Sequence, residues 1–175
     1  MSNERSAERV YIALGSNEAQ GGDAPAAIVE SAIERLAAVG TVARRSQLFA
    51  SRAWPDPSGP TYVNAAAQIE TDLPPQALLA RLLEIENAFG RERRARWAAR
   101  TLDLDILDYA GRVGSFPQSG EGPPLTLPHP RMARRLFVLR PLADIAPDWR
   151  RPRDGRAIAD LIAEAEPETE AWPLS

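Results

Sequence analysis

Two aspartates near the middle of the chain have the clearest chemical potential. Asp103 and Asp105 lie in the apolar run 102–107 (LDLDIL), which is typical of a β-strand. Alternate side chains of a strand share a face, so the two carboxylates project from one side, roughly 7 Å apart, while the intervening apolar side chains project to the core. Mg²⁺ takes one or two carboxylates and completes its coordination with water and phosphate oxygens. The spacing predicts a magnesium site, and it leaves open the alternative of a solvated outer face of an edge strand.

An arginine-rich segment directly precedes this pair. Residues 91–100 contain five arginines, which are Arg91, Arg93, Arg94, Arg96 and Arg100. Planar guanidinium groups bind phosphate oxygens through paired hydrogen bonds and stay charged at any working pH. Together with a metal held by carboxylates, they predict a site for a polyphosphate. The alternative is a solvated basic loop whose arginines pair with nearby glutamates.

Three aromatic or polar groups elsewhere could complete such a site. Tyr62 and Asn64 lie two apart on the polar face of a predicted strand, where a ring can stack on a planar heterocycle and an amide can bind its edge. His129 lies between two prolines and could add a hydrogen-bond donor near phosphate. Arg135 and Phe137 could supply another phosphate contact and another ring face. Each of these residues could instead have a packing or surface role.

The composition excludes several classes of chemistry. The 175 residues include no cysteine and one histidine, so disulfides, thiolate metal sites and multi-histidine centres are excluded. All 21 basic residues are arginine, which excludes a Walker A phosphate loop and Schiff-base catalysis. The net charge of −3 argues against a general nucleic-acid binder. No apolar run is long enough to span a bilayer, so we expect a cytoplasmic protein without a membrane partner.

The pattern of apolar residues and turn signals predicts a single domain over residues 9–165, with residues 1–8 and 166–175 as flexible or peripheral termini. We expect strands at 9–14, 41–49, 61–70 and 102–109, helices at 25–39, 75–89 and 157–165, loops at 50–60 and 111–124, and an apolar segment of undetermined type at 137–142. This order predicts an α+β fold with a ferredoxin-like βαββαβ core and a mainly antiparallel sheet flanked by helices.

The sequence resembles a known enzyme family at six separate places. From about Arg9 to Asp148, its motifs fall in the order and spacing of 6-hydroxymethyl-7,8-dihydropterin pyrophosphokinase; they are 11–17 (YIALGSN), 62–66 (YVNAA), 85–86 (IE), 90–93 (GRER), 96–107 (RWAARTLDLDIL) and 125–131 (LTLPHPR). The resemblance implies an α+β fold. It also implies transfer of pyrophosphate from ATP to the pterin hydroxymethyl oxygen, which gives the pterin diphosphate and AMP in folate biosynthesis. We expect a monomer whose partners are these two substrates.

The resemblance also assigns roles to single residues. Asp103 and Asp105 would bind two Mg²⁺ ions that bridge the ATP phosphates, and either carboxylate could accept the alcohol proton. The triphosphate would be held by Arg91, Arg100, His129 and Arg135, and the nucleotide would also contact Glu86 and Ile106. The pterin ring would lie between Tyr62 and Phe137, with its edge bound by Asn64 and Ser51 and with Gly15 lining the pocket.

Two departures from the family pattern concern the loops around the site. Ser51-Arg52-Ala53-Trp54 stands where the family often has Thr-Pro-Pro, and Ala98-Ala99 replaces the usual Gly-Pro. Two other functions remain open from the residues alone. One is a nucleotide- or RNA-binding module that uses the arginines and Tyr62 as a stacking platform. The other is a metal-dependent phosphoryl or nucleotidyl transferase with a different acceptor.

Overall fold

The computed structural model describes residues 6–90, 101–118 and 123–174, and these form a sheet covered by helices on both faces. The sheet has the strand order β5-β1-β4-β3-β8, with β2 also paired to β4, and each of these described pairs is antiparallel. The strands are β1 (Glu8–Ser16), β2 (Thr41–Arg45), β3 (Phe49–Ser51), β4 (Tyr62–Thr71), β5 (Asp103–Tyr109) and β8 (Ala171–Pro173). A separate hairpin pairs β6 (Gly114–Phe116) with β7 (Leu125–Leu127). The predicted α+β class and antiparallel sheet are confirmed.

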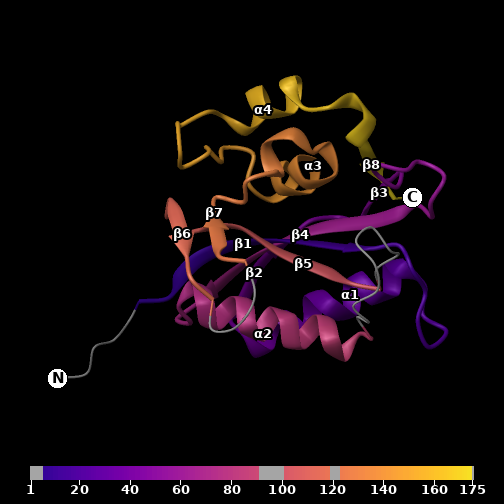
Figure 1. Ribbon diagram of the computed structural model, residues 1–175, viewed down its shortest axis with the longest axis horizontal. Helices are drawn as coiled ribbons and strands as arrows, with labels where there is room; N and C mark the ends of the chain where they lie inside the picture. Colours follow the sequence, from indigo (N-terminus) through magenta and orange to yellow (C-terminus); the bar gives the residue numbers. More distant parts are fainter. Residues whose placement is uncertain (1–5, 91–100, 119–122, 175) are drawn as a thin grey trace.

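The helices form two layers, one on each face of the sheet (Figure 1). One layer consists of α1 (Pro25–Arg35) and α2 (Pro75–Ala88), and the other consists of α3 (Leu136–Ile145) and α4 (Ile158–Glu164). Each layer encloses its own hydrophobic cluster. Three short 3₁₀ helices, η1 (Leu36–Ala38), η2 (Met132–Arg134) and η3 (Pro167–Thr169), lie between these elements.

The central strand β4 follows the predicted period of two. Val63, Ala65, Ala67 and Ile69 belong to the cluster under α1 and α2, whereas Ala66 belongs to the cluster under α3 and α4. Because both faces of β4 are covered, its alanines let the helices approach the sheet closely. The strand therefore runs through the middle of the molecule and brings its first residue, Tyr62, to the sheet end nearest the site described below.

Several element boundaries differ from the sequence-based expectations. The segment 41–49 divides at Ser46, whose N–H and hydroxyl both bind the backbone of Ala66, 2.9 Å away in each case. The apolar segment 137–142 lies within helix α3, and the loop 111–124 contains β6. The tail after Ala165 is expected to be peripheral, and part of it forms the edge strand β8 against β3.

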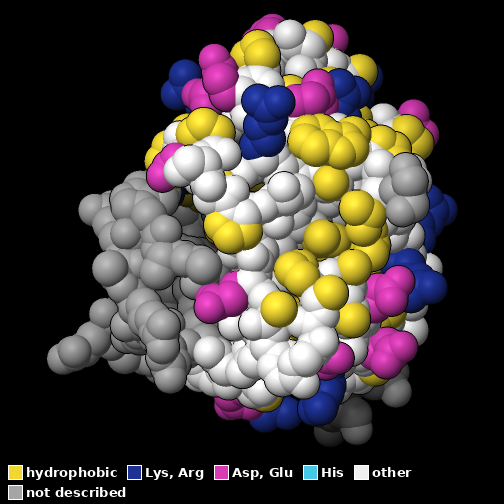
Figure 2. Space-filling view, turned by 90° about the vertical axis from the view of Figure 1, so that its right-hand side faces the viewer, with side chains coloured by type: hydrophobic (Ala, Val, Ile, Leu, Met, Phe, Trp, Pro, Cys, Tyr) yellow, Lys and Arg dark blue, Asp and Glu magenta, His cyan; other side chains and the backbone are white. Residues whose placement is uncertain are grey.

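Hydrophobic and charged side chains are interspersed on the face of the molecule shown in Figure 2. Within the described ranges no helix is long and apolar enough to cross a membrane. Figure 2 shows the side on which the chain ends, where hydrophobic side chains form a band among charged ones. The large hydrophobic residues that are most exposed in the described chain are Val113, Trp172 and Leu174. Trp172 and Leu174 thus stay at the surface, although their segment borders the sheet.

Candidate active site

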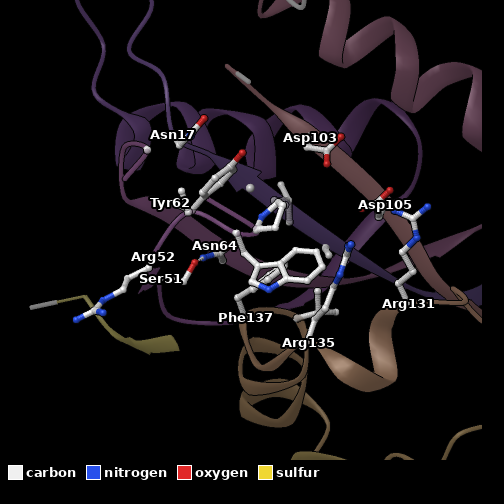
Figure 3. A pocket seen from close by; sticks show the side chains of 18 of the residues that line it. Asn17, Ser51, Arg52, Tyr62, Asn64, Asp103, Asp105, Arg131, Arg135 and Phe137 are labelled. Atoms are coloured by element: carbon white, nitrogen blue, oxygen red, sulfur yellow. Dashed lines mark hydrogen bonds between the residues drawn. The ribbon is translucent and has the colours of Figure 1, made fainter. Parts of the chain in front are cut away.

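A cavity of about 490 Å³ opens where β1, β4 and β5 face the start of α3. Figure 3 shows side chains from these separate segments converging on it. The predicted site residues that line the cavity are Gly15, Ser51, Tyr62, Asn64, Asp103, Asp105, His129, Arg135 and Phe137. Residues far apart in the sequence, some predicted from their own chemistry and others from the family resemblance, therefore share one cavity.

One end of the cavity presents hydrogen-bonding groups and rings. The amide Nδ2 of Asn64 donates to Ser51 Oγ at 2.9 Å, and both side chains are buried. A Cβ atom built on Gly15 would lie 3.5 Å from Asn64 Oδ1 and 3.9 Å from Tyr62 Cδ1, so a larger residue at Gly15 would fill the space in front of both. This end therefore offers a hydrogen-bond acceptor beside the Tyr62 ring.

The aromatic walls of this end come from different layers. Tyr62 is the first residue of β4, whereas Phe137 lies in the first turn of α3 (Figure 3). Both side chains are only partly buried, which leaves ring surface for a ligand. Two rings held by separate elements suit a flat heterocycle better than a flexible chain, because stacking requires planar surfaces.

The other end of the cavity carries the two aspartates. β5 is an edge strand of the sheet, as the alternative interpretation supposed, and it pairs with β1 through Gly15 opposite Asp103 and Ala13 opposite Asp105. Both carboxylates nevertheless line the cavity, and both are shown on the same stretch of β5 in Figure 3. The predicted common direction of the two side chains is thus present.

His129 is held next to the aspartates by β5 itself. Its backbone N–H donates to Leu107 O at 2.9 Å, and its Nδ1 accepts the backbone N–H of Arg131 at 3.3 Å. Burial first, and then the charges of Arg135 and Arg131, lower the pKa of His129 to about 4, against an opposing effect of Asp103. The neutral ring therefore carries its proton on Nε2, which lies 3.9 Å from Asp105 Oδ1.

Among the lining residues that were not predicted from the sequence, five have polar, charged or indole side chains. They are Asn17, Arg52, Trp54, Asp56 and Arg131. Asn17 ties the end of β1 to the β3–β4 loop, because its Nδ2 donates to Pro60 O at 3.4 Å. The quoted motifs 11–17 and 125–131 contain Asn17 and Arg131, so membership in a motif was a usable signal for both. The other three lie on the loop after β3, whose place at the cavity depends on the tertiary fold.

Two residues expected at the nucleotide do not line the cavity. Glu86 is 1% exposed, and its carboxylate accepts the backbone N–H of Leu104 at 2.7 Å, so it fastens α2 to β5. Ile106 is 2% exposed within the core beneath α1 and α2. The side chain of Ile106 therefore has no free surface for a ligand, and a contact with a nucleotide would have to use its backbone. Arg91 and Arg100 lie outside the described residues.

Comparison with known proteins shows which family the chain is similar to. Residues 11–147 match the model of the family described as 7,8-dihydro-6-hydroxymethylpterin-pyrophosphokinase (HPPK). A 2-amino-4-hydroxy-6-hydroxymethyldihydropteridine pyrophosphokinase of Pseudomonas aeruginosa is 44% identical over 160 residues, which cover 89% of this chain and 91% of that protein. The protein of the same name from Synechocystis sp. is 43% identical over 149 residues, covering 84% of this chain and 72% of the relative.

Solved structures support the fold independently of the sequence. The wild-type HPPK-DHPS of Plasmodium falciparum superimposes with a TM-score of 0.75 at 12% identity, over 99% of this chain and 47% of that one. The chain thus spans less than half the length of this solved relative. The matched family model covers most of the chain and two bacterial relatives exceed 40% identity. The chain therefore belongs to the 7,8-dihydro-6-hydroxymethylpterin-pyrophosphokinase family.

Proposed function

We propose that the cavity is where this family's reaction takes place in this chain, with the pterin at the Ser51 end and the ATP triphosphate at the Asp103 end. The observation that carries the proposal is the sharing of one cavity by a polar aromatic slot and by two carboxylates with a cation beside them. A pyrophosphokinase needs a slot for the acceptor directly next to a clamp for phosphates, because the reacting atoms must meet.

The donor set fits magnesium. Asp103 and Asp105 would hold the ion, and within the described residues no group of three or more histidine, cysteine or acidic side chains forms an all-protein cage. Mg²⁺ commonly uses one or two carboxylates and leaves the rest of its octahedron to water and phosphate oxygens. When bound, it would neutralise phosphate charge and hold the triphosphate in one conformation.

The acceptor end fits a pterin. Asn64 Nδ2 is engaged by Ser51, so its Oδ1 faces the cavity as an acceptor for the N–H groups on the edge of the heterocycle. Tyr62 and Phe137 would cover the two faces of the ring. Gly15 would leave room for the ring, because any larger side chain there approaches both Asn64 and Tyr62.

The phosphate end fits the ATP chain. Arg135 keeps its charge at neutral pH, and the imidazole of His129 would donate from Nε2 to a phosphate oxygen. Arg91 and Arg100, which the family resemblance places at the triphosphate, would supply further cations. Such charge neutralisation provides most of the rate enhancement in phosphoryl transfer.

In the chemical step, the hydroxymethyl oxygen of the pterin attacks the β-phosphorus of ATP in line. The new O–P bond forms as the bond between the β-phosphorus and the α–β bridging oxygen breaks, so AMP leaves and the β- and γ-phosphates pass to the pterin. The alcohol proton is taken up by Asp103, Asp105 or water. The protein contributes orientation and fixed charge, and no covalent intermediate with the chain is needed.

The products of the reaction test this proposal. Purified protein is incubated with ATP, Mg²⁺ and 6-hydroxymethyl-7,8-dihydropterin, and the nucleotides are separated by chromatography. We expect AMP and pterin diphosphate in equal amounts. ADP as the nucleotide product would show ordinary kinase chemistry and would refute the proposal.

We also propose that the protein acts in the cytoplasm, as expected from the sequence, because its phosphate donor is ATP. We propose that it acts as a monomer.

A further inference from the structure

Trp54 lies against a charged group of the site, although its position departs from the family pattern. It belongs to the loop between β3 and β4, and the centroid of its ring lies 5.4 Å from the guanidinium carbon of Arg135. The Phe137 ring lies on the same guanidinium, with its centroid 5.6 Å away. Two rings from distant parts of the sequence thus contact one cation, and all three residues line the cavity.

Both contacts lie within the range in which an aromatic ring attracts a cation. A guanidinium within about 6 Å of a ring centroid is attracted by the ring, and the attraction grows when the cation is desolvated. Arg135 is partly buried, and this burial is the main cause that lowers its pKa below the ordinary value, followed by the nearby charge of Arg131. Ring contacts replace part of the water that this guanidinium has lost.

The guanidinium shares the phosphate end of the cavity with the two aspartates. Arg135, Asp103 and Asp105 all line the cavity (Figure 3), and the two carboxylates raise the pKa of Arg135 against the effect of its burial. A free arginine side chain has many rotamers, and fixing them on binding costs affinity. Rings that hold the guanidinium in advance remove part of that cost.

We propose that Trp54 is a positioning residue for ATP: together with Phe137 it holds the guanidinium of Arg135 in the orientation that receives the triphosphate. This inference rests on the proposed function of the cavity. Trp54 would thus raise the affinity for the nucleotide through Arg135, without contacting the phosphates itself.

A double-mutant cycle on the full chain tests the inference. Binding of a non-hydrolysable ATP analogue with Mg²⁺ is measured by calorimetry for wild type, Trp54→Leu, Arg135→Gln and the double variant. We expect Trp54→Leu to weaken binding about tenfold, and Trp54→Phe, which keeps a ring, to recover most of it. In the Arg135→Gln background, Trp54→Leu should have no further effect, because the group it positions is gone.

Trp172→Leu is the matched control, since Trp172 is the exposed tryptophan of β8 and does not line the cavity. Thermal unfolding followed by circular dichroism checks that each variant is folded, and Trp54→Met replaces Trp54→Leu if that variant is not. Equal weakening by Trp54→Leu in both backgrounds, or a rise in the KM for the pterin without one for ATP, would overturn the inference. The product assay on wild type is scored separately: absence of AMP refutes the proposed function, whereas normal AMP formation with additive effects refutes only the role of Trp54.

Discussion

Three aspartates of β5 have different environments because they lie at different places along the strand. Asp103 and Asp105 alternate with core residues and reach the cavity. Opposite β1 the register shifts between Tyr11 and Ile12, which leaves an extra residue in β5 before Asp108. Asp108 is buried, accepts the indole N–H of Trp149 at 2.8 Å and binds the backbone N–H of Gly111 at 2.9 Å. The first two aspartates of β5 are therefore available to a ligand, whereas Asp108 stabilises the fold.

Substitution of these aspartates should separate activity from stability. Asp105→Ala is expected to lower kcat/KM by about 10²-fold or more, because it removes one of the two carboxylates that would hold magnesium at the phosphates, with little change in the free energy of unfolding. Asp108→Ala is expected to cost about 2 kcal/mol of stability, because the buried indole N–H of Trp149 loses its acceptor. Urea unfolding and the AMP assay on the same preparations measure both effects.

Asp108→Ala serves as the control for Asp105→Ala, since the two positions share a strand and a residue type. If Asp105→Ala lowered the free energy of unfolding substantially along with kcat/KM, the activity loss would be explained by loss of the fold. The pair would then belong to the edge strand's surface and not to a magnesium site. If Asp108→Ala lost activity without stability, the division between the two ends of β5 would be wrong.

Site residues could be predicted where their positions follow from the local geometry of one strand. Asp103 and Asp105 share a direction because strand alternation is a local property, so the sequence was sufficient. Trp54 and Asp56 reach the cavity because the loop after β3 folds over it, and no local pattern signals that. Glu86 was expected at the nucleotide, but a carboxylate inside the α2–β5 contact needs a donor, and the backbone N–H of Leu104 supplies one.

At the scale of elements, the end of the chain is fastened to the rest by an ion pair. Arg140 on α3 donates from Nε and Nη2 to the two carboxylate oxygens of Glu170, at 3.1 and 3.2 Å. Glu170 Oε1 also accepts the backbone N–H of Ala171, the first residue of β8. Pro173 has no N–H of its own. The N–H of Ala171 is bound and that of Pro173 is absent, so this edge strand offers few donors to another strand.

The Arg140 pair predicts a pH effect on the docking of β8. Hydrogen bonds from Arg140 lower the pKa of Glu170 below its ordinary value of 4.5. A carboxyl with a lowered folded-state pKa contributes its stability above the ordinary pKa and loses it as the pH falls through the folded value. Both side chains are partly exposed (41% and 46%), so the contribution is about 0.5 kcal/mol.

Comparison of wild type with Glu170→Gln measures this contribution. Wild type is expected to be the more stable protein at pH 7, and its advantage should shrink as the pH falls below 4.5 and Glu170 becomes protonated. Urea unfolding at both pH values provides the free energies. An advantage that stays constant between pH 7 and pH 3 would show that the pair does not act through its charge.

The elements that were hard to predict carry conflicting local signals. Helix α3 has buried residues at helical spacing, but it contains Pro141, which disfavours a helix interior. The tail before β8 is acidic and contains Pro167, and its strand forms against the edge that β3 offers. The two long helices were predicted well because proline starts, apolar periodicity and glycine ends all agree.

At the scale of the whole molecule, the site exists because two layers meet at one end of the sheet. The sheet supplies Tyr62, Asn64 and both aspartates, and the α3 layer supplies Arg135 and Phe137. An RNA-binding module needs an extended basic surface rather than an enclosed cavity with carboxylates. This arrangement, together with the net charge of −3, favours binding of two small substrates.

The dependence of nucleotide binding on magnesium tests the central claim most directly. Calorimetry compares a non-hydrolysable ATP analogue binding to wild type and to Asp105→Ala, in Mg²⁺ and in excess EDTA. The account predicts tight binding by wild type only with Mg²⁺, and weak binding by Asp105→Ala that is about equal in both conditions. Equally tight binding of the analogue by wild type in EDTA would contradict it, because the two carboxylates would then not join the protein to the phosphates through a metal ion.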